Sequence, residues 1–386
     1  MKKIRIIADD KIPFLRGALE EHAEVVYLPG GKISPSDVKD ADALIVRTRT
    51  LCNASLLDGS PVKFIATATI GYDHIDTAYC KKNNIFWTNA PGCNSSSVEQ
   101  YVVSALLSLA VKHKLRLAEM CIAVIGVGNV GSKVARAAKT LGMKVLLYDP
   151  PRAIAEGLDG FDSLGKIKQE ADIVSFHVPL NLEGPYKTFG MADKDFLGGL
   201  KKNAVIINTS RGEVVNEGDL IETSGNRNFR ALVLDVWNNE PNLNSSLLNQ
   251  SAIASPHIAG YSTDGKANGT MMSVQALSRF FKLGLDSWIP RNIPSPENNQ
   301  IVIDCSGMRE IEILHEVYSQ TYDVMIDDAA LRSDVEGFEA LRGSYRLRRE
   351  PSAYSVKLIN NSWPGLEEKF EKLGFSVLAP NCFCEI

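Results

Sequence analysis

The sequence lacks any apolar run long enough to cross a lipid bilayer. The most apolar helical segment, VVSALLSLAV from Val102, is only half as long as the roughly 20 residues that a membrane span needs. The N-terminal stretch MKKIRIIADDKIP has two lysines directly after Met1, but Arg5, Asp9 and Asp10 interrupt its apolar residues. It therefore predicts a first β-strand rather than a signal peptide. We expect no membrane partner and a location in the cytoplasm.

Ordered cysteine patterns and strong net charge are also missing. The seven cysteines are scattered and odd in number, which argues against a disulfide framework and favours reduced thiols. Cys382 and Cys384 form a C-x-C near the C-terminus, but no second pair or histidine cluster accompanies them, so no metal site is expected. The net charge is −4 and no long basic run occurs, so nothing indicates a nucleic-acid partner.

Strand-like apolar runs alternate with helix-like segments along most of the chain. A chain of 386 residues is too long for one ordinary core, so we expect two or three domains. The alternation predicts an α/β fold with parallel sheets covered by helices on both faces. We expect a first unit over residues 1–95, followed by a long helix that leads into a second unit over residues 96–257.

The last third of the chain has a different organisation. A helix is expected over residues 263–283 with no partner strand behind it, so it can return the chain to the first unit, as residues 258–285. The stretch DSWIPRNIPSPENNQ contains three prolines and few apolar residues, which is typical of a linker. Shorter strand and helix patterns follow, and they predict a small α+β C-terminal domain within residues 286–386.

A glycine-rich turn predicts the cofactor. The glycines of VIGVGNVGS form G-x-G-x-x-G between the strand CIAVI and a helix, and the next strand ends in an aspartate. The three glycines would allow a tight turn, close approach of a pyrophosphate and close helix–strand packing, while the helix N-terminus offers free N–H groups. This context predicts a Rossmann-type doubly wound domain. The residues assigned to the dinucleotide from this pattern are Gly126, Gly128, Asn129, Val130, Gly131 and Asp149.

Asp149 favours NAD over NADP. Its carboxylate can accept hydrogen bonds from the ribose hydroxyls, whereas a 2′-phosphate there would meet like charge. Arg152 keeps NADP open as an alternative, because an arginine near this strand end can hold that phosphate. A glycine-rich turn without any ligand is the plain structural alternative.

Three charged residues stand at strand ends or in loops of the second unit: Arg211 in NTSRGEVVN, Glu240 in LDVWNNEP and His257 in SPHIAGY. Ligands of open parallel sheets gather at the carboxyl ends of the strands. Taken singly, each residue can be structural: a surface turn, a helix-dipole partner or a core histidine. Together they fit the oxidation of a 2-hydroxy acid, in which arginine binds the carboxylate, histidine takes the hydroxyl proton and glutamate orients the imidazole.

The motifs GVGNVG, HVPL, INTSRGEVVN, LDVWNNEP and SPHIAG together resemble the D-2-hydroxyacid dehydrogenase family over roughly residues 1–285. The resemblance implies that Arg211, Glu240 and His257 form the catalytic set. It also implies a discontinuous, flavodoxin-like substrate domain, an active site in the cleft between domains, and Asp235 facing the nicotinamide carboxamide. The residues implied near the cofactor are Val178, Thr209, Ser210, Arg211, Asp235, Gly260 and Tyr261, and those implied near the substrate are Thr48, Thr69 and Tyr261.

Several stretches are more particular: TATIGYDHID, NAPGCNSSSVEQYV, YDPPRA, GPYKT and HIAGYSTDGKANGT. They resemble one branch of the family that acts on a phosphorylated 2-hydroxy acid and carries an extra C-terminal domain for dimerisation, which implies a homodimer. Arg47 and Arg49 flank Thr48 and can serve the substrate phosphate, although within a strand they would point away from Thr48. The basic cluster Arg346, Arg348 and Arg349 is predicted to be a solvated helix face.

Two alternatives stay open at this level. The chain can be another D-2-hydroxyacid dehydrogenase, such as one that acts on D-3-phosphoglycerate. It can also be an NAD-sensing binding protein that retains the fold for partner recognition.

Overall fold

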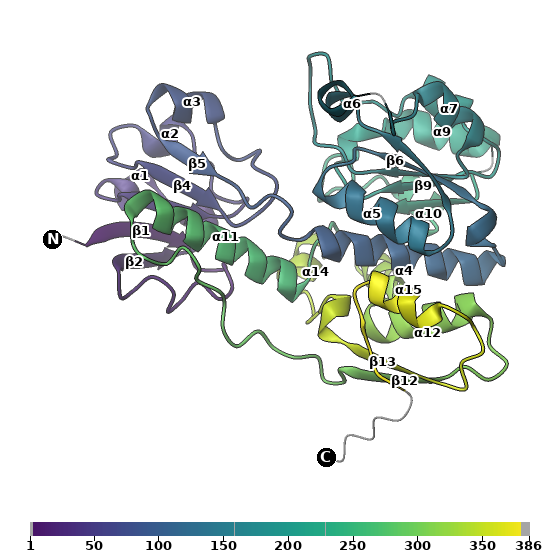
Figure 1. The fold of residues 1–386 in the computed structure, drawn as a ribbon. Coiled ribbons are helices and arrows are strands. Elements are labelled where there is room, and N and C mark those ends of the chain that lie inside the picture. Colours follow the sequence, from purple (N-terminus) through teal and green to yellow (C-terminus); the bar gives the residue numbers. More distant parts are fainter. Residues whose placement is uncertain (1–2, 158, 228, 380–386) are drawn as a thin grey trace. The chain divides into compact units, whose positions relative to one another are not determined.

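The computed structural model describes residues 3–157, 159–227 and 229–379 (Figure 1). Cys382 and Cys384 lie outside the described residues. The contacts divide the chain into unit 1, formed by Met1–Asn94 and Ser262–Pro294, and unit 2, formed by Ser95–Tyr261 and Ser295–Ile386. The C-terminal segment is thus grouped with unit 2, and its division from the cofactor domain stays a prediction. None of the described helices is long and apolar enough to cross a membrane.

Unit 1 is built on a parallel five-stranded sheet in the order β2-β1-β3-β4-β5, which is the flavodoxin-like order that we expected. Its strands are β1 (Ile4–Asp9), β2 (Ala23–Leu28), β3 (Ala43–Val46), β4 (Phe64–Thr67) and β5 (Phe86–Thr88). Its helices are η1 (Gly30–Lys32), α1 (Pro35–Val38), α2 (Ala54–Leu57), α3 (Thr77–Lys82) and α11 (Thr263–Phe281). Strands β3 and β4 are buried along their whole length, as expected for a parallel sheet covered on both faces.

The return helix α11 packs tightly against the strand ends of unit 1. A Cβ atom on Gly269 would lie 2.6 Å from the carbonyl oxygen of Ala68, so only glycine allows this approach. The hydroxyl of Thr270 donates to the carbonyl of Pro13 over 2.8 Å. The chain therefore places the first turns of α11 beside the loops that follow β1 and β4.

Unit 2 contains a parallel six-stranded sheet in the order β11-β10-β9-β8-β6-β7, with the crossover between β6 and β8 that defines a doubly wound fold. The predicted Rossmann-type architecture is confirmed. Its strands are β6 (Cys121–Ile125), β7 (Lys144–Tyr148), β8 (Ile173–Phe176), β9 (Val205–Asn208), β10 (Ala231–Leu234) and β11 (Ile253–Ala254). The helices before and between them are α4 (Ser95–His113), η2 (Leu117–Glu119), α5 (Asn129–Thr140), α6 (Pro150–Glu156), α7 (Leu164–Glu170), α8 (Lys194–Gly199), η3 (Gly212–Val214), α9 (Glu217–Arg227) and α10 (Ser245–Gln250).

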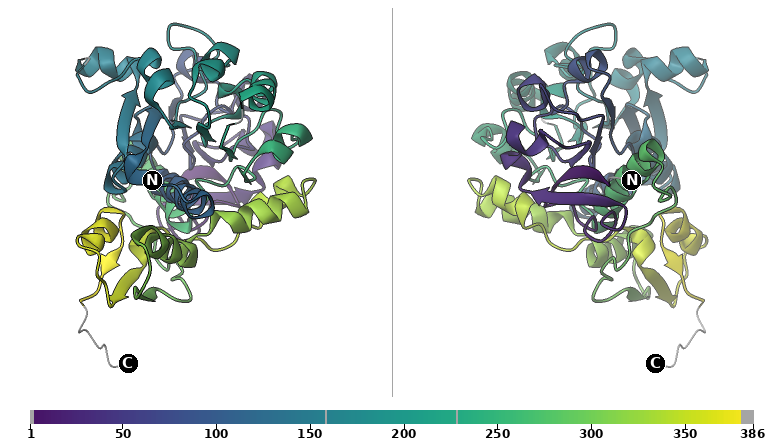
Figure 2. Two further views of the ribbon diagram at one scale, coloured as in Figure 1. Left: turned by 90° about the vertical axis from the view of Figure 1, so that its right-hand side faces the viewer. Right: turned by 90° about the vertical axis from the view of Figure 1, so that its left-hand side faces the viewer.

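The C-terminal segment of unit 2 adds a small sheet of three parallel strands, β12 (Gln300–Asp304), β13 (Ser355–Ile359) and β14 (Ser376–Val377). Its helices are α12 (Glu310–Thr321), α13 (Val324–Ser333), α14 (Phe338–Gly343), η4 (Pro351–Ala353) and α15 (Leu366–Lys372). Helix α12 packs against α4 (Figure 2). The hydroxyl of Ser104 in α4 donates to the carbonyl of Tyr322 over 2.9 Å, so polar contacts also join the two parts of unit 2.

The solvated helix face predicted for Arg346, Arg348 and Arg349 is wrong, because α14 ends at Gly343 and none of the three arginines lies on a helix. Arg348 is not solvated either, since only 2% of it is exposed. Its guanidinium lies 3.6 Å above the ring of Tyr322 and its Nε donates to Oε1 of Gln100 over 3.0 Å. A buried arginine needs an acceptor for each N–H group, and the sequence alone does not show that these acceptors converge here.

The glycine turn of unit 2 is closely packed. A Cβ atom on Gly131, in the first turn of α5, would lie 1.9 Å from the carbonyl oxygen of Gly126. By contrast, a Cβ atom on Gly225 in α9 would meet no atom within 4 Å.

We predict that Gly131→Ala lowers the free energy of unfolding by about 2 kcal/mol or more, because the backbone of the turn must move. Gly225→Ala serves as the matched control, and it should raise the free energy of unfolding by about 0.5–1 kcal/mol because alanine restricts the unfolded chain and favours a helix. Urea unfolding followed by circular dichroism measures both. Equal effects of the two substitutions would contradict the close packing.

Candidate active site

The glycine turn has the shape that a dinucleotide requires. Gly126 has a φ of +86°, and a Cβ atom there would lie 2.6 Å from the carbonyl oxygen of His177. Gly128 precedes α5 as its N-cap, and the position of its missing Cβ atom faces open space, with no atom within 4 Å. Free N–H groups at the helix N-terminus beside an open backbone fit a pyrophosphate.

Asp149 and Arg152 have defined partners at the end of β7. The carboxylate of Asp149 accepts hydrogen bonds from the backbone N–H of Val127 over 2.8 Å and of Arg152 over 3.1 Å. The guanidinium of Arg152 makes two hydrogen bonds with Glu156, over 2.7 and 2.8 Å, and also donates to the carbonyl of Val127. Arg152 is therefore engaged by a carboxylate, which favours Asp149 as the group that receives the ribose, and hence NAD.

Val178 and Thr209 lie beside this turn. A Cβ atom on Gly126 would come within 2.7 Å of a methyl group of Val178. The hydroxyl of Thr209 lies 3.2 Å from Nδ1 of His177, whose Nε2 lies 2.9 Å from the hydroxyl of Ser175. Burial lowers the pKa of His177 to about 3, so this ring is neutral and positions Thr209 without carrying charge.

The structure brings Glu240 and His257 into direct contact. Nδ1 of His257 lies 2.8 Å from Oε2 of Glu240, while Oε1 of Glu240 accepts the backbone N–H of Trp237 over 3.0 Å. The side chain of His257 is 30% exposed, and its contact with Glu240 is made through Nδ1. His257 has a φ of +55°, an unusual conformation for a residue with a side chain, which the surrounding loop must hold.

The environment of Glu240 favours its ionised form. Burial alone raises the pKa of this carboxyl, but the hydrogen bond and charge of His257, the N–H of Trp237 and the charge of Arg342 together lower it below its ordinary value. An ionised glutamate on Nδ1 fixes the orientation of the imidazole and stabilises it when it gains a proton at Nε2.

Asp235 organises the loop that carries His257. Its carboxylate is 1% exposed and accepts the backbone N–H groups of Ile258 over 2.8 Å and Ala259 over 2.9 Å, and the hydroxyl of Ser255 over 2.6 Å. Its backbone carbonyl accepts the N–H of His257 over 2.7 Å. Burial raises the pKa of this carboxyl despite these bonds. The carboxylate thus supports the backbone of residues 255–259, and a contact with the nicotinamide stays a prediction.

Arg211 follows β9, as Glu240 follows β10 and His257 follows β11. These three strands are neighbours and run parallel, so their carboxyl ends lie at one edge of the sheet. Nη1 of Arg211 donates to the carbonyl of Ser210 over 2.9 Å. Ser210 is held by Asn208, whose Oδ1 accepts its N–H over 3.1 Å and its hydroxyl over 2.8 Å.

Thr69 of unit 1 ends a chain of hydrogen bonds. Its hydroxyl donates to the carbonyl of Gly71 over 2.9 Å, lies 2.7 Å from the hydroxyl of Thr67, and Thr67 in turn lies 3.1 Å from Nε2 of His74. Burial lowers the pKa of His74 to about 4, so the ring is neutral and can donate from Nε2 to Thr67. This chain fixes the Thr69 hydroxyl at the end of β4.

Arg47 and Thr48 lie beyond the strand in which their directions would alternate. Strand β3 ends at Val46, and the N–H of Thr50 donates to the carbonyl of Arg47 over 3.2 Å to close a turn. Arg47 as a residue is half-buried, and its guanidinium donates to the carbonyl of Lys11 over 3.2 Å at an exposed position, whereas Thr48 is exposed. Arg47 and Thr48 do not lie in a strand, so the expectation that their side chains point in opposite directions does not apply to them.

Lys266 is a basic residue that the sequence analysis did not assign. Burial, and then the charge of Arg47, lower the pKa of its ammonium to about 8. Two cations thus lie near each other at the strand ends of unit 1, an arrangement that an anion would stabilise. The sequence feature that could have indicated Lys266 is its position in the stretch HIAGYSTDGKANGT, which resembles one branch of the family.

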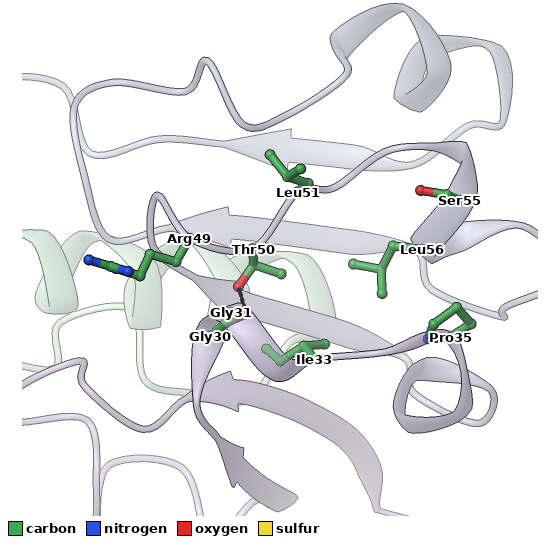
Figure 3. Close-up of a pocket in the computed structure, with 9 residues that line it drawn as sticks. All are labelled: Gly30, Gly31, Ile33, Pro35, Arg49, Thr50, Leu51, Ser55 and Leu56. Atoms are coloured by element: carbon green, nitrogen blue, oxygen red, sulfur yellow. Dashed lines mark hydrogen bonds between the residues drawn. The ribbon is translucent and has the colours of Figure 1, made fainter. Parts of the chain in front are cut away.

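A pocket of about 240 Å³ in unit 1 is lined by Arg49, which was considered for the substrate phosphate, and by none of the other predicted site residues (Figure 3). The hydroxyl of Thr50 in its wall already donates to the carbonyl of Gly30 over 2.9 Å. Figure 3 shows the Arg49 side chain extending away from the other lining side chains. The lining residues are Gly30, Gly31, Ile33, Pro35, Arg49, Thr50, Leu51, Ser55 and Leu56. Because Thr50 is already hydrogen-bonded and Arg49 extends away from the other lining side chains, we assign no substrate group to this pocket.

Tyr261 closes the loop that begins at His257. Its N–H donates to the carbonyl of Ile258 over 2.8 Å, and its hydroxyl accepts a hydrogen bond from Arg342 over 3.2 Å. Gly260 precedes it and is partly buried. Among the described residues, no group of three or more His, Cys, Asp and Glu side chains can hold a metal ion.

We predict that Glu240→Gln lowers the free energy of unfolding at neutral pH. In acid, the free energies of unfolding of the two proteins should become equal. The folded-state pKa of Glu240 is lowered, so its stabilising contribution is present above the unfolded-state value and is lost as pH falls through the folded-state value. Urea unfolding of both proteins between pH 7 and pH 3 measures this. A difference that stays constant over this pH range would contradict the ionised carboxylate.

Comparison with known proteins agrees with this geometry. Residues 99–259 match the family described as D-isomer specific 2-hydroxyacid dehydrogenase, NAD binding domain. Residues 293–374 match a family described as a domain of unknown function (DUF3410). A solved D-lactate dehydrogenase from Aquifex aeolicus, complexed with NAD and lactic acid, has a TM-score of 0.62 and 26% identity, and covers 74% of this chain and 97% of its own. The predicted NAD cofactor is confirmed.

Two curated relatives cover nearly the whole chain. The erythronate-4-phosphate dehydrogenase of Bacteroides fragilis (strain ATCC 25285) is 50% identical over 354 residues, which are 92% of this chain and 99% of the relative. The erythronate-4-phosphate dehydrogenase of Escherichia coli O157:H7 (strain EC4115) is 40% identical over 378 residues, with 97% of this chain and 99% of the relative covered. The chain therefore belongs to the erythronate-4-phosphate dehydrogenase family of NAD-dependent, D-isomer specific 2-hydroxyacid dehydrogenases.

Proposed function

We propose that the protein oxidises 4-phospho-D-erythronate to (R)-3-hydroxy-2-oxo-4-phosphooxybutanoate, with NAD as the hydride acceptor, in the biosynthesis of pyridoxal 5′-phosphate (vitamin B6). The observation that carries the proposal is the contact of 2.8 Å between His257 and Glu240 at the strand ends of the cofactor domain. The names of the relatives supply the substrate.

The side chains divide the reaction as follows. Arg211 binds the substrate carboxylate through its guanidinium fork and orients the C2 hydroxyl. Nε2 of His257 accepts the hydroxyl proton as the C2–H bond breaks, and Glu240 stabilises the imidazolium that forms. Bound NAD supplies the hydride acceptor, held by the glycine turn and by Asp149. Proton and hydride thus leave the alcohol together, and the ketone of the 2-oxo acid remains.

The phosphate of the substrate needs cations. We assign it to Arg47, with Lys266 beside it, because these two side chains are near each other and burial depresses the pKa of the lysine. Thr48, Thr69 and Tyr261 are the further substrate contacts of this proposal. A homodimer formed through the C-terminal domain and a cytoplasmic location complete it.

A substrate panel tests the proposal. The purified protein is offered NAD with 4-phospho-D-erythronate, D-3-phosphoglycerate and D-lactate, and the reverse reaction is measured with NADH. We expect the highest kcat/KM with 4-phospho-D-erythronate. A preference for D-3-phosphoglycerate would instead show the alternative dehydrogenase, and NAD binding without turnover of any 2-hydroxy acid would indicate a sensor.

We predict that His257→Ala lowers kcat by about 100-fold or more, which is the range that a lost general base gives, while NAD affinity stays within about twofold. Turnover is followed by absorbance at the NADH band, and NAD affinity by fluorescence titration. Unchanged kcat would show that another group takes the proton.

We predict that kcat/KM for 4-phospho-D-erythronate falls above pH 8. Lys266 is charged below its pKa of about 8 and loses its proton above it, so the attraction for the phosphate declines in that range. In Lys266→Met the value should be low already at pH 7 and should lack this decline. The matched control is Lys282→Met, an exposed lysine at the end of the same helix. If kcat/KM of Lys266→Met still falls above pH 8, the assignment of the phosphate to Lys266 is contradicted.

A further inference from the structure

The C-terminal segment holds the loop that carries His257, which we call the catalytic loop and define as residues 254–261. At its start, Oδ1 of Asp328 accepts the N–H of Ala254 over 2.7 Å. In its middle, Nη1 of Arg348 donates to the carbonyls of Ile258 over 3.4 Å and Ala259 over 3.2 Å. The loop is therefore braced by residues that are more than 70 positions further along the chain.

At the end of the catalytic loop stands Tyr261, and its partner is Arg342 of α14. Nη2 of Arg342 donates to the Tyr261 hydroxyl over 3.2 Å, and the guanidinium lies 5.8 Å from the centre of the Tyr261 ring. The ring of Tyr345 packs edge-on against Tyr261, with the ring centres 5.8 Å apart. The tyrosine is thus held at its hydroxyl and on its ring by α14 and the residues after it.

The guanidinium of Arg342 is largely buried and has a fixed orientation. Its side chain is 20% exposed, and Nη1 pairs with Oε1 of Glu339 over 2.9 Å. The group also lies 5.6 Å from the centre of the Phe338 ring. Because the planar fork bonds to Glu339 with one nitrogen and to Tyr261 with another, a lysine cannot reproduce both contacts.

Arg342 also affects the pair that handles the proton. Burial raises the pKa of Glu240, and the lowering contributions come first from His257, then from Trp237 and finally from the charge of Arg342. Hydrogen bonds also connect the two regions: Arg342 bonds to Tyr261 at one end of the catalytic loop, and His257 of the same loop bonds to Glu240. A cation at this position opposes protonation of Glu240 and so preserves its charge beside His257.

We propose that Arg342 is a positioning residue, which fixes the Tyr261 hydroxyl for the substrate and supplies positive charge beside the Glu240–His257 pair. The inference rests on the proposed function, because it takes Tyr261 as a substrate contact. It gives a role in the active site to a segment whose matching family model is described as a domain of unknown function. The substrate class that it concerns is the phosphorylated 2-hydroxy acid of the same reaction.

The test compares Arg342→Met, Arg342→Lys and Tyr261→Phe with the unaltered enzyme. For Arg342→Met we expect kcat/KM with 4-phospho-D-erythronate to fall about tenfold or more, as for loss of a hydrogen bond to a charged group. The acidic limb of the pH profile should move to higher pH, because Glu240 then binds a proton more readily. In Arg342→Lys, the acidic limb should lie where it does in the unaltered enzyme, whereas KM should still be raised. Tyr261→Phe should raise KM and leave the acidic limb in place.

A double-mutant cycle separates positioning from general damage. If Arg342 acts through Tyr261, the double variant Arg342→Lys with Tyr261→Phe should have the same KM as either single variant. Additive effects on KM would overturn the positioning of Tyr261. The matched control is Arg309→Met, an exposed arginine of the same segment that pairs with Glu312 over 2.7 Å, and it should behave as the unaltered enzyme.

A readout without substrate keeps this inference distinct from the proposed function. The Glu240 carboxyl carbon is followed by ¹³C NMR during a pH titration, in the unaltered protein and in Arg342→Lys and Arg342→Met. A titration midpoint that rises in Arg342→Met and not in Arg342→Lys supports the role of the charge, whichever 2-hydroxy acid proves to be the substrate. A midpoint that is unchanged in both variants overturns it. If Arg342→Met does not fold, Arg342→Gln takes its place.

Discussion

The hydrogen bond between Nδ1 of His257 and Oε2 of Glu240 requires the surrounding chain to hold both residues in place. It fixes the orientation of the imidazole through Nδ1, and His257 has a φ of +55°. A residue with a side chain holds that conformation only where its neighbours determine it. The buried carboxylate of Asp235 does so by accepting the N–H groups of Ile258 and Ala259, directly after the histidine.

Two partly buried titratable groups of the site, Glu240 and His177, differ in charge. Glu240 keeps a lowered pKa because cations and N–H groups face it, whereas His177 beside the glycine turn is neutral because burial lowers its pKa to about 3. Glu240 is therefore a charged partner of His257, whereas His177 is a neutral partner of Thr209.

The features that the sequence predicted are those set by short stretches. The turn at Gly126 and Gly131 follows from steric limits within a few residues, and the position of Arg211, Glu240 and His257 after three neighbouring parallel strands follows from strand order. The sequence did not predict contacts between residues that are far apart in the chain. Arg348 was predicted to be solvated, yet it is buried against α4 and the catalytic loop, because its acceptors come from residues about 90 and 250 positions away. Likewise, the length of β3 decided how Arg47 lies, and periodicity does not fix a strand end.

The bracing of the catalytic loop by Asp328, Arg342 and Arg348 has a consequence for motion. Local opening of a protein proceeds in cooperative units whose members share contacts. The N–H of Ala254 and the carbonyls of Ile258 and Ala259 lose their partners when the C-terminal segment detaches, so loop and segment belong to one such unit. Hydrogen exchange at the catalytic loop then reports the integrity of helices encoded far downstream, and the segment cannot be treated as a detachable module of the enzyme.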